Sequence, residues 1–502
     1  MNSSTHFMRP DEENRPPPVL VNNASGDDVA AIHYRNQRSA HWDEVARWMD
    51  WHRGLGRTYR RRLVEIYRFL IPKGSRVLEI GCAQGDLLAE IDATTSVGVD
   101  FSKEMLERAR RKHPEIQFLE AEAHALRIEE VFDAIILSDV VNDVRDLQTV
   151  LEQIARMSSP HTRVILNFYN RLWEFPLLLA QRLGLTRPNL AQNWLTIEDV
   201  KGLLELANFE VIRHRKEVLL PLPVPLLSTF VNCYLVRMWP FNIAALTHVV
   251  VARPMLPRRA EAREVLVSVI VPARNEAANI AEIFARTPEL GAGTELVFVE
   301  GGSTDDTFEV IEQAIAAHPE RRCLLLRQTG EGKGDAVRLG FEHASGDVLM
   351  ILDSDLTVVP EDLPRFLDVL VSGKADFVNG SRLVYPMEKE AMRPLNVIGN
   401  KFFSLAFSWL LEQPLKDTLC GTKVLWKTDY ERIAAHRDYF GNFDPFGDFD
   451  LLFGAAKQNL KILDLPIRYR ERVHGTTNIR RWSHGWLLLK MVIFAARRIK
   501  FI

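Results

Sequence analysis

The chain has 502 residues, enough for two to four domains, and 47% of them are hydrophobic. Its formal net charge of −3 is far from the strongly basic balance of nucleic-acid-binding proteins, so we expect no nucleic-acid partner. Its four cysteines lack metal-site spacing and argue against a disulfide framework, so we expect a cytoplasmic protein.

Residues 1–30 are polar and rich in proline, and they lack the apolar core of a signal peptide. We predict a disordered tail.

Residues 31–253 alternate between short apolar runs and helical patterns. Such alternation predicts a mostly parallel sheet with helices on both faces. The predicted strands are 75–80, 96–100, 116–120, 132–138 and 162–168, followed by 209–215 and 247–253, and helices are expected between them, including one over 196–207.

In such sheets, ligands bind beyond the carboxyl ends of the strands. Residues 79–86 read EIGCAQGD after the first strand, and the glycines at 81 and 85 let backbone N–H groups approach a ligand closely. The second strand ends at Asp100, where an acid can accept hydrogen bonds from ribose hydroxyls.

The segments VLEIGCAQGDLL (77–88), VGVDFSKEML (97–106), EAEAHAL (120–126) and FDAIILSDVV (132–141) together resemble class I methyltransferases that use S-adenosylmethionine. The resemblance implies a Rossmann-like domain, and Ala83 stands where many members have glycine. It implies cofactor contacts from Glu79, from Gly81 and Gly85 around the methionine part, from Asp100 at the ribose, and from Glu122 and Ala123 at the adenine. By the same resemblance Asp139 faces the methyl group or its acceptor.

Methyl transfer from a sulfonium depends mainly on alignment of the nucleophile, so the sequence does not name the acceptor. His41 and His124 are candidate bases, although a lone histidine is more often structural.

The most membrane-like stretch is residues 218–236, which is uncharged and long enough to span a bilayer. Its prolines at 221, 223 and 225 each remove a helix hydrogen bond, so we do not expect a transmembrane helix there. Residues 254–264 are basic and lack periodicity, and we predict a linker.

Residues 265–480 show a second alternation of predicted strands and helices. The predicted strands are 265–273, 295–300, 322–328, 348–353 and 376–381. The fourth strand ends at Asp353 and Asp355. Mg²⁺ or Mn²⁺ bound by one or two carboxylates and by diphosphate oxygens would offset their repulsion. Alone, the triplet is better interpreted as a turn that caps a helix. In series with the polar loops 272–276, 300–306 and 330–335, it favours a metal and diphosphate site.

The segments VSVIVPARNE (267–276), VFVEGGSTDDT (297–307) and GDVLMILDSDLTVVPEDL (346–363) resemble family 2 glycosyltransferases of the GT-A type. The resemblance implies that Pro272, Glu276, Glu300 and Asp305 contact the nucleotide sugar, Lys333 a phosphate or the base, and Asp353 and Asp355 the nucleotide and the metal. Glu300-Gly301 stands where many members have two aspartates, which leaves the base preference open.

The segment NFDPFGDFDLL (442–452) is similar to the one that carries the catalytic acid residue of this family. We predict that Asp448 is a general base that deprotonates an acceptor hydroxyl, with inversion at the anomeric carbon. The alternative is that Asp448 or Asp450 caps the following helix.

Arginines alternate in residues 467–472, which predicts a strand with Arg470 and Arg472 on one face, suited to phosphate or to surface salt bridges. This end resembles polyprenyl-phosphate glycosyltransferases, with Asn478 near the place of their usual lysine. Residues 400–423 are predicted as an acceptor-side or core helix. The basic, acid-free residues 481–502 are predicted as an amphipathic helix that lies on a membrane or packs on its own domain.

The sequence therefore predicts an α/β protein of two doubly wound domains, a Rossmann-like methyltransferase and a GT-A glycosyltransferase. We expect a bifunctional enzyme that uses S-adenosylmethionine, a nucleotide-sugar donor and Mg²⁺ or Mn²⁺, acts on an envelope glycan or polyprenyl phosphate, and sits at the inner face of the cytoplasmic membrane. The alternative is a glycosyltransferase with a non-catalytic, methyltransferase-like binding domain.

Overall fold

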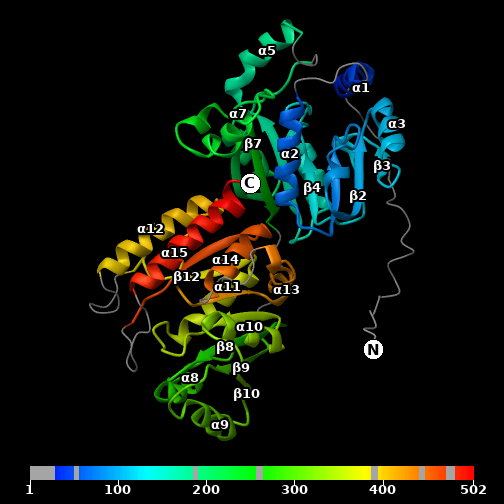
Figure 1. Cartoon of the computed structure of the whole chain (residues 1–502). Helices are drawn as coiled ribbons and strands as arrows, with labels where there is room; N and C mark the ends of the chain where they lie inside the picture. Colours follow the sequence, from blue (N-terminus) through cyan, green and yellow to red (C-terminus); the bar gives the residue numbers. More distant parts are fainter. Residues whose placement is uncertain are drawn as a thin grey trace, which may run out of the picture.

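The computed structural model describes residues 29–49, 56–184, 190–255, 264–385, 394–439, 447–470 and 481–502. In these ranges the chain forms two α/β domains in series, each built on a seven-stranded sheet (Figure 1). The predicted fold class is confirmed. Residues 1–28 of the predicted tail and most of the predicted linker lie outside the described residues, and residues 29 and 30 already belong to the first helix.

The sheet of the N-terminal domain has the strand order β3-β2-β1-β4-β5-β7-β6. Neighbouring strands are parallel except at β7, which is antiparallel to both β5 and β6. The strands are β1 (Ser75–Ile80), β2 (Ala93–Asp100), β3 (Gln117–Glu120), β4 (Ala134–Leu137), β5 (Arg163–Tyr169), β6 (Phe209–Glu217) and β7 (Thr247–Pro254).

The helices of this domain are α1 (Val29–Met49), α2 (Arg57–Leu70), α3 (Lys103–Lys112), α4 (Leu147–Arg156), α5 (Glu174–Arg182), α6 (Ile197–Leu206) and α7 (Leu227–Cys233). Polar caps begin several of them; Ser102, for example, accepts a hydrogen bond from the N–H of Met105 at the start of α3. The helix expected between β1 and β2 is a single 3₁₀ turn, Leu88–Glu90, because the glycine turn and an earlier start of β2 leave no room for more.

The sheet of the C-terminal domain has the order β10-β9-β8-β11-β13-β12-β14. Here β13 is the antiparallel strand, between β11 and β12. The strands are β8 (Leu266–Ala273), β9 (Gly293–Glu300), β10 (Arg322–Arg327), β11 (Val348–Ile351), β12 (Phe377–Ser381), β13 (Lys423–Trp426) and β14 (Ile462–Pro466).

Its helices are α8 (Ile280–Arg286), α9 (Thr307–Ala317), α10 (Lys333–His343), α11 (Leu363–Val371), α12 (Pro394–Leu411), α13 (Lys427–Ala435), α14 (Asp448–Lys457) and α15 (Arg481–Ala495), with a π-helical turn at Ala496–Lys500. The central strands β4 and β11 are buried along their whole length, as their continuous apolar runs predicted. The hydrophobic core of each domain therefore holds in place the strand ends where the predicted site residues lie.

Buried charged side chains join the two domains. Arg163 and Arg253 both pair with Asp376, at 2.8 and 2.9 Å, and the Nε of Arg215 lies 3.0 Å from an Oε1 of Glu412. Buried ion pairs demand good geometry to offset their desolvation. These contacts therefore fix how the domains sit against each other.

The C-terminal segment is helical, as predicted, and α15 lies beside α12 (Figure 1). The chain then reaches the N-terminal domain, where Arg215 donates to the carbonyl oxygens of Ile499 and Lys500, both at 3.3 Å. Among the described helices, none combines the length and the hydropathy needed to cross a bilayer.

Candidate functional site

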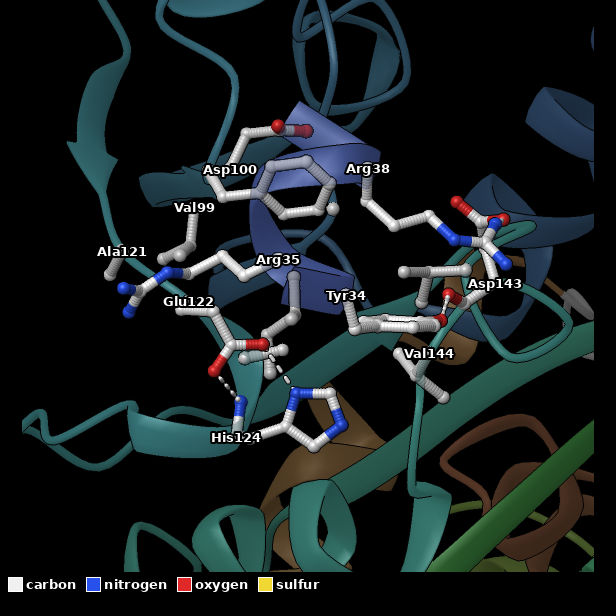
Figure 2. A pocket seen from close by; sticks show the side chains of 15 residues that line it. Tyr34, Arg35, Arg38, Val99, Asp100, Ala121, Glu122, His124, Asp143 and Val144 are labelled. Carbon is white, nitrogen blue, oxygen red and sulfur yellow. Dashed lines mark hydrogen bonds and ion pairs between the residues drawn. The ribbon is translucent and has the colours of Figure 1, made fainter. Parts of the chain in front are cut away.

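The carboxyl ends of β1 to β4 bring most of the predicted cofactor residues to one pocket, shown in Figure 2. Gly81, Asp100, Glu122 and Ala123 line it, together with Tyr34, Arg35 and Arg38 of α1. The other predicted residues of this site, Glu79, Gly85 and Asp139, are not among the lining residues. The sequence thus located the pocket but not the helix that closes it.

The turn after β1 holds three residues in the left-handed region, with φ of 76° at Gly81, 47° at Ala83 and 75° at Gly85. A Cβ on Gly85 would lie 2.6 Å from Phe118, so glycine is required there for space as well. A non-glycine residue in this region costs about 1–2 kcal/mol. Ala83 is therefore strained, at the position where the resemblance expects glycine.

Asp100 braces this turn from the end of β2. Its Oδ2 accepts a hydrogen bond from the N–H of Ala83, and its Oδ1 one from the N–H of Ser102, both at 2.9 Å. Burial raises the pKa of Asp100, and these backbone hydrogen bonds oppose the rise. Each oxygen has a second lone pair, so the carboxylate can also accept a hydrogen bond from a ligand hydroxyl.

Glu79 lies behind the turn, in β1, and is buried. Burial raises the pKa of Glu79 well above its usual range, and the nearby Asp100, Asp86 and Asp139 raise it further. Within the described part of the chain its Oε2 has no hydrogen-bond partner. An unpartnered buried acid favours a donor or a positive charge next to it, which fits a ligand with an ammonium or sulfonium group.

Glu122 is oriented by His124 (Figure 2). Glu122 accepts a hydrogen bond from the N–H of His124 at 3.1 Å and contacts its Nδ1. The N–H of Asp146 donates to the Nε2 of the same ring at 3.0 Å, which places the proton of the neutral ring on Nδ1, facing Glu122. His124 is thus a positioning residue for Glu122.

Helix α1 covers the pocket through Asp143. Arg38 forms an ion pair with Asp143, and Tyr34 donates to its carbonyl oxygen. Trp42 Nε1 donates to Asp143 Oδ2 at 2.7 Å. Sequence reasoning missed this contribution, because α1 precedes the first motif and its polar positions follow no recognisable pattern.

Asp139 follows β4 with φ of 56° and joins a polar network. Tyr59 and Asn167 each donate to its Oδ1 at 2.6 Å. Burial and the charge of Asp139 raise the pKa of Tyr59 well above its usual range, so Tyr59 remains a donor. The network fixes a carboxylate at the same sheet edge as the pocket.

In the C-terminal domain, Lys333 at the start of α10 forms an ion pair with Asp353 after β11. Burial alone would raise the pKa of Asp353, but the Lys333 ammonium outweighs it and lowers this pKa. Gly421 packs directly on the pair: a Cβ there would lie 2.1 Å from Asp353 Oδ2 and 2.3 Å from Lys333 Nζ. Any side chain at position 421 would displace one of the two charges.

Asp355 shapes its own turn and joins two other segments to it. Its Oδ1 accepts hydrogen bonds from the N–H and the hydroxyl of Thr357, at 3.2 and 2.8 Å. The carbonyl oxygen of Thr357 accepts from the N–H of Arg470 at 3.1 Å, and the Ser354 hydroxyl donates to the carbonyl oxygen of Pro272 at 2.9 Å. Pro272, Asp355 and the backbone of Arg470 are therefore brought together.

The loops after β8 and β9 are joined by hydrogen bonds. The Asn275 side chain accepts from the N–H of Thr304 at 2.8 Å, and the N–H of Glu276 donates to the Thr307 hydroxyl at 3.0 Å.

Two predicted nucleotide contacts take part in these loops. Glu300 is buried, and its Oε1 accepts from the N–H of Ser303 at 2.5 Å. Asp305 is exposed and accepts from the N–H of Thr307 at 3.1 Å, at the start of α9. Asp305 therefore also bonds the first N–H group of α9.

Asp448 is the first residue of α14, and its side chain lies outside what the structure describes. The residue before it, Gly447, has φ of 75°, and a Cβ there would lie 2.6 Å from the Cα of Gly334. Helix α14 thus begins against the residue next to Lys333. Asp450 instead pairs with Arg437 at 3.0 Å, which gives it a structural role.

The prediction of a strand over 467–472 is wrong for residues 467–470, and residues 471 and 472 lie outside the described residues. β14 ends at Pro466, because its partner β12 ends at the paired residue Ser381. Arg470 is exposed beyond this end, and Arg472 lies outside the described residues.

No cluster of three or more His, Cys, Asp or Glu side chains able to ligate a metal occurs among the described residues. Asp353 and Asp355 offer two carboxylates, so a divalent ion held there would need further oxygens from a bound diphosphate or water. This is the arrangement expected of a metal that arrives with its nucleotide.

Comparison with known families decides what these two domains are. Residues 52–214 match a family model described as a methyltransferase domain, and residues 268–433 match that of glycosyl transferase family 2. The chain carries a methyltransferase domain followed by a family 2 glycosyltransferase domain.

The curated relatives match the glycosyltransferase domain. Glycosyltransferase AglJ of Haloferax volcanii is 32% identical over 215 residues, which cover 42% of this chain and 66% of that protein. Dolichol-phosphate mannosyltransferase of Pyrococcus furiosus is 37% identical over 121 residues, which cover 24% of this chain and 33% of that protein. The chain thus spans less than two thirds of the length of either relative.

The methyltransferase domain aligns with a solved SAM-dependent methyltransferase from Thermotoga maritima at 16% identity and a TM-score of 0.34. The alignment covers 44% of this chain and 99% of that one.

Sequence reasoning missed a buried ion pair that supports the glycosyltransferase site. Arg382 donates to both carboxylate oxygens of Asp417, at 2.7 and 2.9 Å, and Asn400 donates to Oδ1 at 3.0 Å. Burial would raise the pKa of Asp417, but Arg382 beside it lowers this pKa to about 2. The pair anchors the segment that leads to Gly421, and no spacing in the sequence links its two members.

Proposed function

We propose that the glycosyltransferase domain transfers a sugar, with inversion, from a nucleotide sugar to a polyprenyl phosphate or a lipid-linked glycan. We propose further that the methyltransferase domain transfers a methyl group from S-adenosylmethionine, so that the chain is bifunctional. The observation that carries the first part is the close packing of Lys333, Asp353 and Gly421 at the carboxyl edge of the second sheet. The name of the Pyrococcus relative, a dolichol-phosphate mannosyltransferase, supports the acceptor class.

In this proposal the loops after β8 and β9 hold the donor nucleotide. Pro272, Glu276, Glu300 and Asp305 contact its nucleoside part. Lys333 would bind the diphosphate in place of Asp353, and Asp353 and Asp355 would hold Mg²⁺ or Mn²⁺. A divalent ion bound there would offset the charge that develops on the departing nucleotide.

Asp448 is proposed as the general base for a hydroxyl acceptor, since α14 begins beside Lys333. A phosphate acceptor is already anionic and needs no base. Arg470 and Arg472 are then proposed to hold that phosphate, and the backbone of Arg470 lies next to the Asp355 turn.

For methyl transfer, the turn at Gly81 and Gly85 with Glu79 is proposed to hold the methionine part of the cofactor. Asp100 would accept from the ribose, Glu122 and Ala123 would contact the adenine, and Asp139 would position the acceptor within its Tyr59–Asn167 network. Bound S-adenosylmethionine would supply an activated methyl group, so orientation of the acceptor is the main task of these residues.

A second candidate is a methyltransferase-like domain without activity, and the strained Ala83 in the cofactor turn favours it. Calorimetry with S-adenosylmethionine separates the two. If the wild type binds S-adenosylmethionine and Asp100→Ala does not, the result supports the methyltransferase. If the wild type does not bind it, or if the wild type and Asp100→Ala bind it equally, the result supports the non-catalytic domain.

The glycosyltransferase proposal is tested by turnover of a panel of nucleotide sugars with Mn²⁺, with and without polyprenyl phosphate. We expect Asp355→Ala to reduce turnover by at least about a hundredfold, because the metal and diphosphate site loses a carboxylate. The matched control is Asp368→Ala, an exposed acid on α11. Equal activity of Asp355→Ala and Asp368→Ala would contradict the assignment of Asp355 to the metal site.

We also propose that the protein acts at the inner face of the cytoplasmic membrane, with α15 as the contact. The exposed Lys490, Arg497 and Arg498 near the exposed Trp486 support this placement.

A further inference from the structure

The connection between β6 and β7, residues 218–246, exposes apolar side chains to an unusual degree. Ten of the 26 exposed large hydrophobic side chains in the described ranges lie in these 29 residues. Leu226 is 88% exposed and Trp239 79%. Monomeric soluble proteins rarely show such a contiguous apolar surface unless it binds a partner.

This connection has a defined conformation. The Asn232 side chain accepts hydrogen bonds from the N–H groups of Leu219 and Leu220, at 2.8 and 2.9 Å, and donates to the Leu220 carbonyl oxygen at 2.8 Å. Arg237 is buried and pairs with Glu217 at 2.5 Å. Asn232 and Arg237 are thus buried, while ten apolar side chains of the same connection are exposed.

The exposed apolar surface continues across the domain boundary. Phe230 packs on Tyr234 and Tyr234 on Phe501, with ring centroids 5.6 and 5.2 Å apart. Phe501 in turn contacts Trp409 of α12 at 5.7 Å. Figure 1 shows the chain end beside the N-terminal domain, with α12 and α15 running away from it.

We call residues 218–246, α12 and α15 together the apolar platform. On α12 and α15 its exposed apolar side chains are Ile398, Phe402, Leu405, Trp409, Trp486 and Ile493.

The charges of the apolar platform have one sign. None of its three segments contains an aspartate or glutamate. The exposed charged residues on or next to it are Lys401, Lys490, Arg497 and Arg498. Exposed aromatic and aliphatic groups among basic residues complement the acyl chains and headgroups of an anionic bilayer.

The platform also lies at a defined edge of the methyltransferase sheet. β6 runs in the same direction as β4 and β5, because β7 is antiparallel to both β5 and β6. Residues 218–246 therefore begin at the same edge as Asp139, which follows β4.

We propose that the methyltransferase domain itself docks on an anionic lipid bilayer through residues 218–246, as part of one surface shared with α12 and α15. The inference builds on the membrane placement proposed above for α15 and extends it to the other domain. A bilayer in this position lies beside the Asp139 edge, so an acceptor held in the membrane can reach it.

The test is co-sedimentation of the full chain with vesicles of phosphatidylcholine alone and of phosphatidylcholine mixed with phosphatidylglycerol. No sugar nucleotide or cofactor is added, so the result does not depend on either proposed activity. The test variant is Leu226→Ser/Trp239→Ser, both strongly exposed. The matched control is Leu206→Ser, an exposed leucine on α6. Trp486→Ser tests α15.

We expect the wild type to bind the anionic vesicles, less strongly at high salt. The double variant should lose at least about tenfold in its partition coefficient with an unchanged melting temperature, while Leu206→Ser binds like the wild type. No wild-type binding, or equal binding by the double variant and the wild type, would overturn the proposal. So would a loss of binding confined to Trp486→Ser. If light scattering shows that the wild type is a dimer and the double variant a monomer, the surface would instead be assigned to self-association.

Discussion

Arg163, the first residue of β5, and Asp376, next to the first residue of β12, form a buried ion pair across the domain boundary, with 2.8 Å between Nη2 and Oδ2. Arg253 pairs with the other oxygen of the same carboxylate at 2.9 Å, and the N–H of Lys461 donates to Oδ2 at 2.9 Å. One acid thus joins two strands of the methyltransferase sheet to the glycosyltransferase sheet.

We predict that Asp376→Asn lowers the free energy of unfolding by about 3–5 kcal/mol, because it removes the counter-charge of the buried Arg163 and one of the two counter-charges of the buried Arg253, which also pairs with Glu210. Urea unfolding followed by circular dichroism measures this. Glu107→Gln, which breaks an exposed pair with Arg111, should change it by less than about 0.5 kcal/mol. Similar effects of the two substitutions would mean that the buried pair does not hold the domains.

Gly421→Ala should abolish most sugar transfer and leave S-adenosylmethionine binding unchanged. The added methyl group would overlap Asp353 Oδ2 and Lys333 Nζ, so the two charges must separate. The measurements are nucleotide release and calorimetry. In the control Gly399→Ala, on α12, nothing lies within 4 Å of the new Cβ, and stability should rise by up to about 1 kcal/mol. Full sugar transfer by Gly421→Ala would contradict the role given to the Lys333–Asp353 pair.

Ala83→Gly should raise the melting temperature or leave it unchanged. The expected gain in the free energy of unfolding is up to about 1 kcal/mol. Glycine removes the cost of φ 47°, which outweighs the extra chain entropy of glycine in the unfolded state. Thermal unfolding tests this, and calorimetry with S-adenosylmethionine shows whether the strain serves binding. A clear loss of stability would show that the Ala83 methyl group contributes packing greater than its strain.

The stacked pair His214 and His248, 2.7 Å apart between ring nitrogens, should make the protein less stable as the pH falls from about 6.5 toward 4. Burial lowers the pKa of His214 to about 4 and that of His248 to about 3. The unfolded chain therefore takes up protons near pH 6.5 that the folded protein cannot bind.

Each histidine adds up to about 1.4 kcal/mol per pH unit to this slope. His248→Gln should make the slope of unfolding free energy against pH shallower, whereas His343→Gln, an exposed histidine, should not. Parallel curves for His248→Gln and the wild type would refute the assignment.

The sequence specified the strand ends well, for a physical reason. Short continuous apolar runs between turn residues are typical of strands buried on both faces, and parallel strands bring their carboxyl ends to one edge. Gly81, Asp100 and Glu122 therefore line one pocket, and Lys333 pairs with Asp353, although only their positions in the sequence were known. Their roles remain predictions.

Other features depend on contacts that no local pattern encodes. Tyr34 and Arg38 reach the first pocket only because α1 folds back on Asp143, more than a hundred residues later. Arg382 and Asp417 likewise form an ion pair, although no pattern in the sequence links them. The strand predicted at 467–472 is absent over the described residues 467–470 for the same reason, since whether β14 continues is decided by the end of β12 and not by the alternating arginines.

The contact between Gly447 and Gly334 also has an electrostatic consequence. α10 and α14 begin next to each other, so two helix N-termini, whose first N–H groups have no partner within their own helix, lie beside Lys333. Each helix start carries roughly half a positive charge from its aligned peptide dipoles. The backbone alone therefore gives this end of the second domain a positive potential, before any metal or side chain contributes. This potential favours an anionic group at that place, such as the diphosphate of the proposed nucleotide sugar.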